Sequence, residues 1–160
     1  RHLGADVTSR ARALFESMST VEDALAAATV GLRRGGVRAM HDATEGGVRN
    51  AVWEMAQASG VGVDVDLSKT YVDLAVAAVS KVFDMDPLDA ISEGTLLIAV
   101  EPEAAHEVLA RLKRKGIVAA DIGEFTKKRG PCLDRGRPFR PADRDPFWIA
   151  FSRALAGEIT

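Results

Sequence analysis

Several residue types are scarce in this chain of 160 residues, and each scarcity excludes a class of site. The single cysteine, Cys132, excludes an intrachain disulfide and any metal site built mainly from cysteine. The three histidines, His2, His41 and His106, are far apart and lack the spacing that is typical of zinc ligands. We therefore expect no metal to be bound by this chain alone.

Long apolar runs and a strong charge imbalance are also missing. No run approaches the roughly 18 apolar residues that a membrane-spanning helix needs, and the N-terminus lacks the basic and then apolar pattern of a signal peptide. The formal net charge is −2, which gives no broad basic field for binding nucleic acid. We expect a cytoplasmic protein whose partners are neither nucleic acid nor membranes.

Side-chain amides are almost absent, because Asn50 and Gln57 are the only two. Scarcity of these thermolabile residues is typical of a heat-adapted protein, and a GC-rich genome would produce the same bias. The chain begins at Arg1 without a methionine, which is compatible with a fragment of a longer protein.

The first half of the chain alternates helical and strand patterns. Apolar residues recur at helical spacing before stop signals such as Gly35-Gly36 and Gly60, and Val61 to Val65 alternates with a period of two. The predicted elements are a helix from Ser19 or Thr20 to about Arg34, a strand at 37–41, a helix at 45–59, a strand at 61–65 and a helix at 72–83.

The second half continues the alternation. Residues 95–100 are apolar throughout, which predicts a strand covered on both faces. A helix is predicted from Pro102 to Lys115, followed by a returning strand from Ile117 to Phe125, so residues 95–125 would form a strand, helix, strand unit. The predicted fold class is α/β, an α+β sandwich with a mixed β-sheet covered by helices.

The predicted organisation is a linker remnant at 1–18, a domain core at 19–126, and a connector with a closing helix of the same domain at 127–160. Residues 127–145 are rich in Arg, Pro and Gly. They indicate either a basic phosphate-binding patch or, because acids alternate with the bases, a solvated connector or edge hairpin. Phe147, Trp148 and Phe151 are expected to pack the closing helix on the domain.

The junction between the strand at 37–41 and the next helix carries the candidate site. Asp42 or Thr44 could cap this helix, and Asp42 with Glu45 has the spacing of a capping box. Gly46 and Gly47 weaken a first turn by roughly 1 kcal/mol each relative to alanine, however. Glycines here would also let a ligand approach, and a helix N-terminus attracts anions. Both interpretations, cap and ligand site, stay open on the residues alone.

Three stretches, "MHDATEGGVRNAVWEMAQASGVGV", "DMDPLDAISEGTLLIAV" and "DIGEF", resemble the C-terminal domain of the AIR synthase-related superfamily. The resemblance covers residues 15–125 approximately and is closest to the hydrogenase expression/formation branch, whose members act as carbamoyl dehydratases. The residues that match its motifs are Met40, Asp42, Thr44, Gly46 and Gly47, then Asp86, Pro87, Leu88, Glu93 and Gly94.

The resemblance implies an enzyme of two α/β domains that is dimeric through the N-terminal one. That domain would bind most of the ATP and its Mg²⁺, and this chain would be the closing half, catalytically incomplete alone. ATP would activate an amide- or carboxyl-type oxygen of a small-molecule or peptide-borne substrate by phosphorylation. The resemblance implies catalytic roles for Asp42 and Thr44, and cofactor contacts from Gly46, Gly47, His41 and Glu93.

Two departures separate the chain from the hydrogenase branch. The residue before the glycine pair is usually arginine there and is Glu45 here, so a cationic contact has become anionic. The branch also ends in a cysteine that carries the carbamoyl group, whereas this sequence ends "AGEIT" and Cys132 is internal. Cys132 is therefore interpreted as an incidental loop residue, and carbamoyl dehydratase activity is not expected.

Two other classes of function stay open beside the partial enzyme. One is a free-standing protein-binding or assembly module without ATP chemistry. The other is a hydrolase that uses His41 with Asp42, for which no serine or thiol has helpful spacing. Trp53 lies off the buried stripe of its helix, so either a partner covers it or another part of this domain does.

Overall fold

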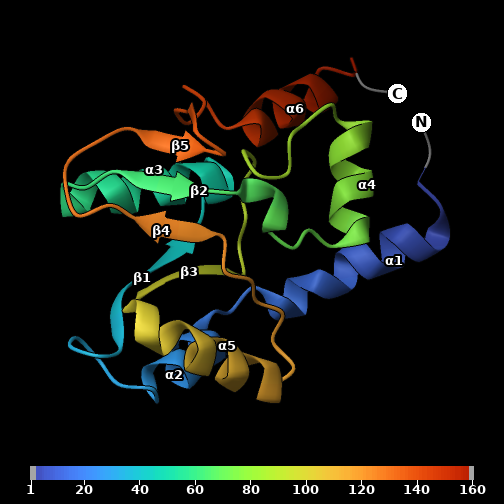
Figure 1. Cartoon of the computed structure of the whole chain (residues 1–160). Helices are drawn as coiled ribbons and strands as arrows, with labels where there is room; N and C mark the ends of the chain where they lie inside the picture. Colours follow the sequence, from blue (N-terminus) through green and yellow to red (C-terminus); the bar gives the residue numbers. More distant parts are fainter. Residues whose placement is uncertain (1–2, 159–160) are drawn as a thin grey trace.

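The computed structural model describes residues 3–158, so His2 and the outermost residues of the two terminal segments lie outside the described residues. Helices and short strands alternate along the chain (Figure 1). The α-helices are α1 (Ala5–Ala13), α2 (Val21–Ala28), α3 (Gly47–Ser59), α4 (Leu74–Val82), α5 (Ala105–Arg114) and α6 (Pro146–Leu155). The strands are β1 (Val37–Ala43), β2 (Val63–Val65), β3 (Thr95–Val100), β4 (Gly123–Phe125), β5 (Cys132–Asp134) and β6 (Arg137–Pro138). Three 3₁₀ turns, η1 (Leu14–Ser17), η2 (Leu67–Lys69) and η3 (Pro102–Ala104), complete the set.

The strands form two sheets. β1 and β3 pair antiparallel, and in their register Ala43 faces Thr95. The other sheet has the order β4-β2-β5-β6 and is mixed, because β2 runs antiparallel to β4 and parallel to β5. The predicted α/β class with a mixed sheet and covering helices is confirmed.

The predicted strand, helix, strand unit at 95–125 is wrong. β3 and β4, its two strands, belong to different sheets (Figure 1). Residues 117–122 form no strand, and β4 begins only at Gly123. A Cβ at Gly123 would lie within 3 Å of the backbone of β2, so the close approach of β4 to β2 decides the pairing. Apolar periodicity alone does not say which neighbour a strand will find.

A first core cluster joins α3 to both sheets. The predicted apolar stripe of α3 is buried, and it packs against Ala43 of β1 and against Val63, Val65 and Cys132 of the four-stranded sheet. Trp53 is half-buried and packs on this cluster, so the domain itself covers it and it does not indicate a missing partner. The predicted stripe consists of Val48, Ala51, Val52 and Met55, and Ala56 is buried beside it.

A second core cluster lies on the other face of the β1–β3 sheet. There α2 and α5 pack against Val37, and Met40, Ile98 and Val100 adjoin them (Figure 1). Because Leu97 contacts the first cluster and Ile98 the second, the prediction that residues 95–100 are covered on both faces is confirmed. Every residue of β3 nevertheless stays partly exposed, since a two-stranded sheet leaves its edges open.

α2 is shorter than predicted. It ends at Ala28 instead of Arg34, and Gly31, Arg33 and Gly35 all have positive φ. The backbone of Val37 exchanges hydrogen bonds with Gly31 and Arg33, and these bonds compete with continuation of the helix.

Residues 5–17, within the predicted linker, are helical and pack on the domain. Arg10 of α1 donates to Asp73, the N-cap of α4, at 2.9 Å. The backbone N–H of Ala75 and the Arg10 guanidinium hold the pKa of Asp73 below its usual range. A side chain at Gly94 would meet the carbonyl of Ser17. The assignment of residues 1–18 to a linker stays a prediction.

The C-terminal segment forms a hairpin and a helix. β5 and β6 pair antiparallel, which agrees with the predicted edge hairpin at 127–145. α6 matches the predicted closing helix, but its aromatic rings pack largely on one another, with centroids 5.1 to 6.1 Å apart. Phe151 stays 46% exposed, so the prediction that it packs on the domain is wrong.

No helix within residues 3–158 combines the length and the apolar character that crossing a bilayer requires.

Leu67→Ala should destabilise the domain far more than Leu74→Ala. Leu67 is 2% exposed in the first core cluster, so its truncation leaves a cavity and should lower the free energy of unfolding by about 2 to 5 kcal/mol. Leu74 is 87% exposed, and its truncation should change that free energy by less than about 0.5 kcal/mol. Urea denaturation followed by circular dichroism measures both. Equal losses would contradict the assigned core.

Candidate functional site

The carboxyl end of β1 brings three predicted site residues to one edge of its sheet. The register places Ala43 opposite Thr95, and the N–H of Ser92 donates to the carbonyl of Thr44 at 3.2 Å. Glu93 follows Ser92 and is exposed, and the Asp42 side chain is 64% exposed. Asp42, Thr44 and Glu93 therefore lie at the same end of the β1–β3 sheet, as the ligand-site interpretation requires.

His41 makes a different contact. Its Nε2 lies 2.8 Å from Glu54 Oε2 on α3, whereas its Nδ1 is 3.9 Å from Asp42 Oδ1, beyond hydrogen-bond distance. Successive residues of a strand point to opposite faces, so His41 and Asp42 diverge. The predicted hydrolase pair thus has no hydrogen bond between its members, and the imidazole is engaged with α3.

The turn from β1 into α3 differs from the predicted helix start. β1 continues to Ala43, so Asp42 lies in the strand and does not cap α3. The N-cap is Gly46, with φ +76°. Glycine has no side chain, so the N-cap residue makes no side-chain hydrogen bond to α3. The capping-box interpretation is therefore wrong, because the strand extends through the residues that would have formed the cap.

The glycine pair is required by the packing of this turn. Gly46 and Gly47 both have positive φ, and a Cβ at Gly47 would lie 2.5 Å from the carbonyl oxygen of Leu88 and 2.7 Å from that of Ala90. The Gly47 N–H donates to Thr44 at 3.1 Å, so that amide is engaged within the chain. A structural reason for both glycines exists without a ligand, and their contact with a cofactor stays a prediction.

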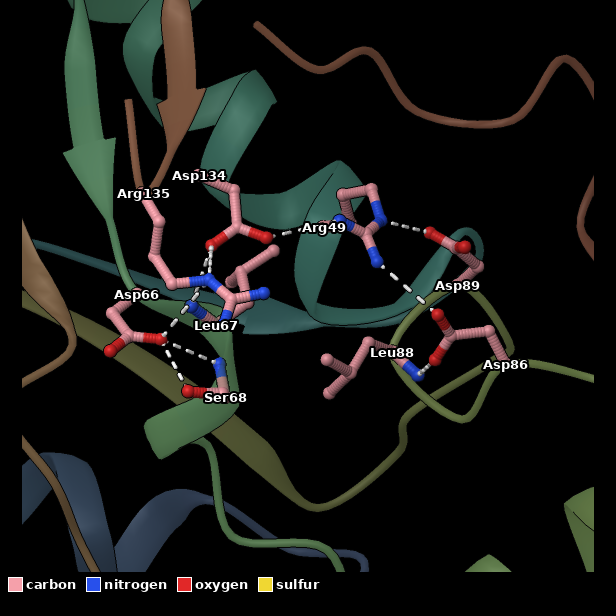
Figure 2. A network of polar contacts seen from close by, with 9 residues as sticks. All are labelled: Arg49, Asp66, Leu67, Ser68, Asp86, Leu88, Asp89, Asp134 and Arg135. Carbon is pink, nitrogen blue, oxygen red and sulfur yellow. Dashed lines mark hydrogen bonds and ion pairs between the residues drawn. The ribbon is translucent and has the colours of Figure 1, made fainter. Parts of the chain in front are cut away.

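Arg49, in the first turn of α3, holds the Asp86–Ala90 turn in place (Figure 2). Its Nε donates to Asp89 at 2.6 Å and its Nη2 to Asp86 at 3.3 Å, while its backbone N–H donates to Leu88. Its side chain is 18% exposed. One guanidinium thus fastens the "DPLD" stretch to the start of α3 through both side chain and backbone.

The same guanidinium reaches the four-stranded sheet. Arg49 Nη1 lies 4.0 Å from Asp134 Oδ2, and Figure 2 shows this carboxylate between Arg49 and Arg135. The other oxygen of Asp134 accepts the backbone N–H of Leu67 at 3.1 Å. The Arg49 cation also stands 5.9 Å from the centre of the Phe139 ring. Sequence reasoning missed Arg49, because its three carboxylate partners are distant in the chain.

The C-terminal segment reaches the Gly46 turn. The Gly46 N–H donates to Asp145 Oδ2 at 2.7 Å, across 99 positions of sequence, and the indole N–H of Trp148 donates to Glu45 at 2.9 Å. Sequence reasoning treated Asp145 only as an acid of the connector. The Asp145-Pro146 pair is a typical helix-start signature and could have identified it as the N-cap of α6, though not as the partner of Gly46.

Cys132 lies in β5 and is 4% exposed in the first core cluster, so its interpretation as an incidental loop residue is wrong. Burial raises the pKa of its thiol, and a hydrogen bond with Gln57 partly offsets that effect. A buried thiol with a raised pKa is a poor nucleophile, which is consistent with a packing role.

The candidate site residues do not form a compact cluster of metal ligands. Among the described residues, no three His, Cys, Asp or Glu side chains are grouped to hold a metal ion. Asp42 and Glu93 are separate exposed carboxylates, and the amides of Gly46 and Gly47 have partners in the chain.

The sequence over residues 3–133 matches the family described as AIR synthase related protein, C-terminal domain. The carbamoyl dehydratase HypE of Escherichia coli is 42% identical over 100 residues, which cover 61% of this chain and 30% of that protein. A hydrogenase expression/formation protein of Methanocaldococcus jannaschii is 33% identical over 94 residues, covering 58% of this chain and 28% of that protein. The chain thus spans less than a third of these two curated relatives.

Solved structures of HypE resemble the fold of this chain. The crystal structure of E. coli HypE, a hydrogenase maturation protein, has a TM-score of 0.67 and 34% identity over 79% of this chain and 41% of that chain. HypE in a HypE–HypF complex has a TM-score of 0.62 and 25% identity over 78% and 41% of the two chains. HypE in complex with ATP has a TM-score of 0.58 and 25% identity over 71% and 38%. The predicted resemblance, including its closeness to the hydrogenase branch, is confirmed.

Gly47→Ala should be markedly destabilising, whereas Gly60→Ala should be mild. Both glycines have a similar positive φ, +64° and +66°, but a Cβ at Gly60 would meet nothing within 4 Å. The conformational cost common to both is about 1 to 2 kcal/mol. The clash with Leu88 and Ala90 should raise the loss for Gly47→Ala to about 2 to 5 kcal/mol. Thermal unfolding compares the two variants, and similar midpoints would refute the tight turn.

Arg49→Ala should lower the free energy of unfolding by about 1 to 3 kcal/mol, because it leaves Asp86, Asp89 and Asp134 without their shared cation. The control is Arg38→Ala, whose partner Glu101 and own side chain are 33% and 53% exposed; an ion pair this exposed contributes under about 1 kcal/mol. Urea titration at low salt measures both variants. A larger loss for Arg38→Ala would contradict the assigned role of Arg49.

Proposed function

The chain belongs to the AIR synthase-related protein family as a C-terminal domain, and from that premise we propose that it is the substrate-side half of an ATP-dependent enzyme. The whole enzyme activates an amide- or carboxyl-type oxygen by phosphorylation. Its N-terminal domain binds most of the ATP and Mg²⁺ and forms the homodimer. The HypE structure solved with ATP supports nucleotide chemistry for the full-length relatives.

The meeting of Asp42, Thr44 and Glu93 at one end of the β1–β3 sheet is the observation that carries this proposal. Asp42 does not cap α3, and among the described residues it forms no ion pair closer than 3.9 Å. Its exposed side chain is therefore available to a ligand. Exposed carboxylates and a threonine at one end of a sheet can receive a polar substrate or a metal-bound water at a domain boundary.

Each predicted site residue has a proposed role in this scheme. ATP supplies the phosphoryl group. Asp42 would orient the loop or contact a magnesium-bound water, and the Thr44 hydroxyl would donate to the reacting oxygen. Glu93 contacts the cofactor. His41 points to the other face of β1 and lies 2.8 Å from Glu54, so its proposed role is to hold β1 on α3. Gly46 and Gly47 let the turn approach the cofactor closely while packing on the Asp86–Ala90 turn.

Hydrogenase maturation is the proposed setting, because the relatives include HypE proteins named carbamoyl dehydratase. The substrate is a small molecule or a group carried on a peptide. Glu45 alters the charge beside the glycine pair, and its carboxylate accepts the Trp148 indole N–H. We therefore propose a substrate preference that differs from that of relatives with arginine at this position.

A protein-binding or assembly module is the second candidate, and exposed apolar side chains favour it. Phe15 of η1 and Val21 and Leu25 of α2 are 72%, 61% and 64% exposed. Exposed apolar residues such as these suit contact with another domain or protein. In the enzyme proposal the N-terminal ATP-binding domain makes this contact; in the second candidate a separate partner does, without ATP turnover.

Asp42→Ala in the full-length gene product should reduce ATP turnover roughly a hundredfold, as expected for loss of a group that acts on the reacting centre. The matched control is Asp64→Ala, which removes an exposed aspartate from β2 in the other sheet and should leave turnover unchanged. Phosphate release with amide, thioamide and carbamoyl donors measures the rates.

Full turnover in Asp42→Ala would remove Asp42 from the site. No turnover by the unmodified protein with any donor would refute the enzyme proposal and leave the binding module.

A further inference from the structure

The family match ends at residue 133, yet the segment that follows is built into the candidate site. β6 pairs with β5, and Phe139 packs on the first core cluster. The chain then enters α6, whose first residues return to the turn between β1 and α3 (Figure 1). A part of the chain outside the matched region therefore contacts the Glu45–Gly47 turn.

Asp145 makes the central contact. It is 7% exposed, and its two carboxylate oxygens serve different helices. Oδ1 accepts the N–H of Phe147 at 2.7 Å and caps α6, while Oδ2 accepts the N–H of Gly46 at 2.7 Å. Hydrogen bonds of this length between a carboxylate and backbone N–H groups at helix starts are strong, because the donors carry partial positive charge.

Trp148 adds a second tie one turn along α6. Its indole N–H donates to Glu45 Oε1 at 2.9 Å, and its ring packs edge-to-face on Phe147 and Phe151. Glu45 and Gly46, two successive residues of the turn, are thus both bound to α6.

The other side of the turn is fastened by backbone contacts. The Thr44 carbonyl accepts the N–H groups of Gly47 and Ser92, and the Leu88 carbonyl accepts that of Arg49. The Gly46 N–H instead depends on one side chain, that of Asp145. Two consecutive glycines with positive φ have more backbone freedom than other residues, so this bond selects one conformation of the turn.

We propose that Asp145 is a positioning residue, whose carboxylate fixes the Thr44–Gly47 turn so that Asp42 and Thr44 keep their orientation toward the substrate. This inference rests on the proposed function of the same edge. It adds the C-terminal segment to the site, although residue 145 lies beyond the family match.

Asp145→Ser separates the two contacts of the carboxylate. Serine is a good N-cap, and its hydroxyl oxygen can still accept the Phe147 N–H. Its side chain is shorter and has only one oxygen, so it cannot also accept the Gly46 N–H. Asp145→Ala removes both contacts. Asp143→Ser, two residues earlier at an exposed position, is the matched control.

In the full-length gene product, Asp145→Ser and Asp145→Ala should reduce the kcat for ATP turnover alike, by about tenfold to a hundredfold, with KM for ATP changed less than about threefold. The melting temperature should fall clearly only in Asp145→Ala, because α6 loses its cap there. A merely structural role predicts that kcat follows the melting temperature. Wild-type kcat in Asp145→Ser would overturn the proposal.

Amide hydrogen exchange of the 160-residue chain, measured by NMR, decides the inference separately from the enzyme proposal. In Asp145→Ser the Gly46 N–H should exchange at least about tenfold faster, while the Arg49 N–H, held by Leu88, should keep its rate. Unchanged Gly46 exchange would overturn the positioning role. Absence of ATP turnover in the unmodified protein would refute the proposed function alone.

Discussion

Where β1 turns into α3, the backbone of Gly47 packs so near Leu88 and Ala90 that a Cβ at this position would lie 2.5 Å and 2.7 Å from their carbonyl oxygens. This approach lets the 86–90 turn accept the Arg49 N–H and directs the chain through Ser92 to the Thr44 carbonyl. Beyond this hydrogen bond, β1 pairs with β3. The end of that sheet carries the candidate site residues.

Two charged side chains, Arg49 and Asp145, hold the turn between β1 and α3. Arg49 gathers carboxylates from the 86–90 turn and from β5, and so joins the start of α3 to the four-stranded sheet. The Asp145 carboxylate accepts hydrogen bonds from N–H groups at the starts of both α3 and α6. Both groups are largely buried, so their partners are held in defined geometry. The turn is therefore rigid on both sides even though it contains two glycines.

Much of the secondary structure could be predicted from residue patterns. The extent of β3 at residues 95–100 and the presence of the closing helix α6 agree with prediction, since an unbroken apolar run is a strong local signal. Of the candidate site, Asp42, Thr44 and Glu93 were identified through family motifs, and the structure brings them to one edge. The capping box failed because the extension of β1 to Ala43 depends on its pairing with β3, which is not a local property.

By itself the sequence determined the family, the α/β class, the buried stripe of α3 and the end of α3 at Gly60, because periodicity and glycine act over a few residues. Only the tertiary structure decided which strands share a sheet, why Gly47 must be glycine, and that Asp145 binds Gly46. These features join residues far apart in the chain, and their geometry exists only once both core clusters have packed.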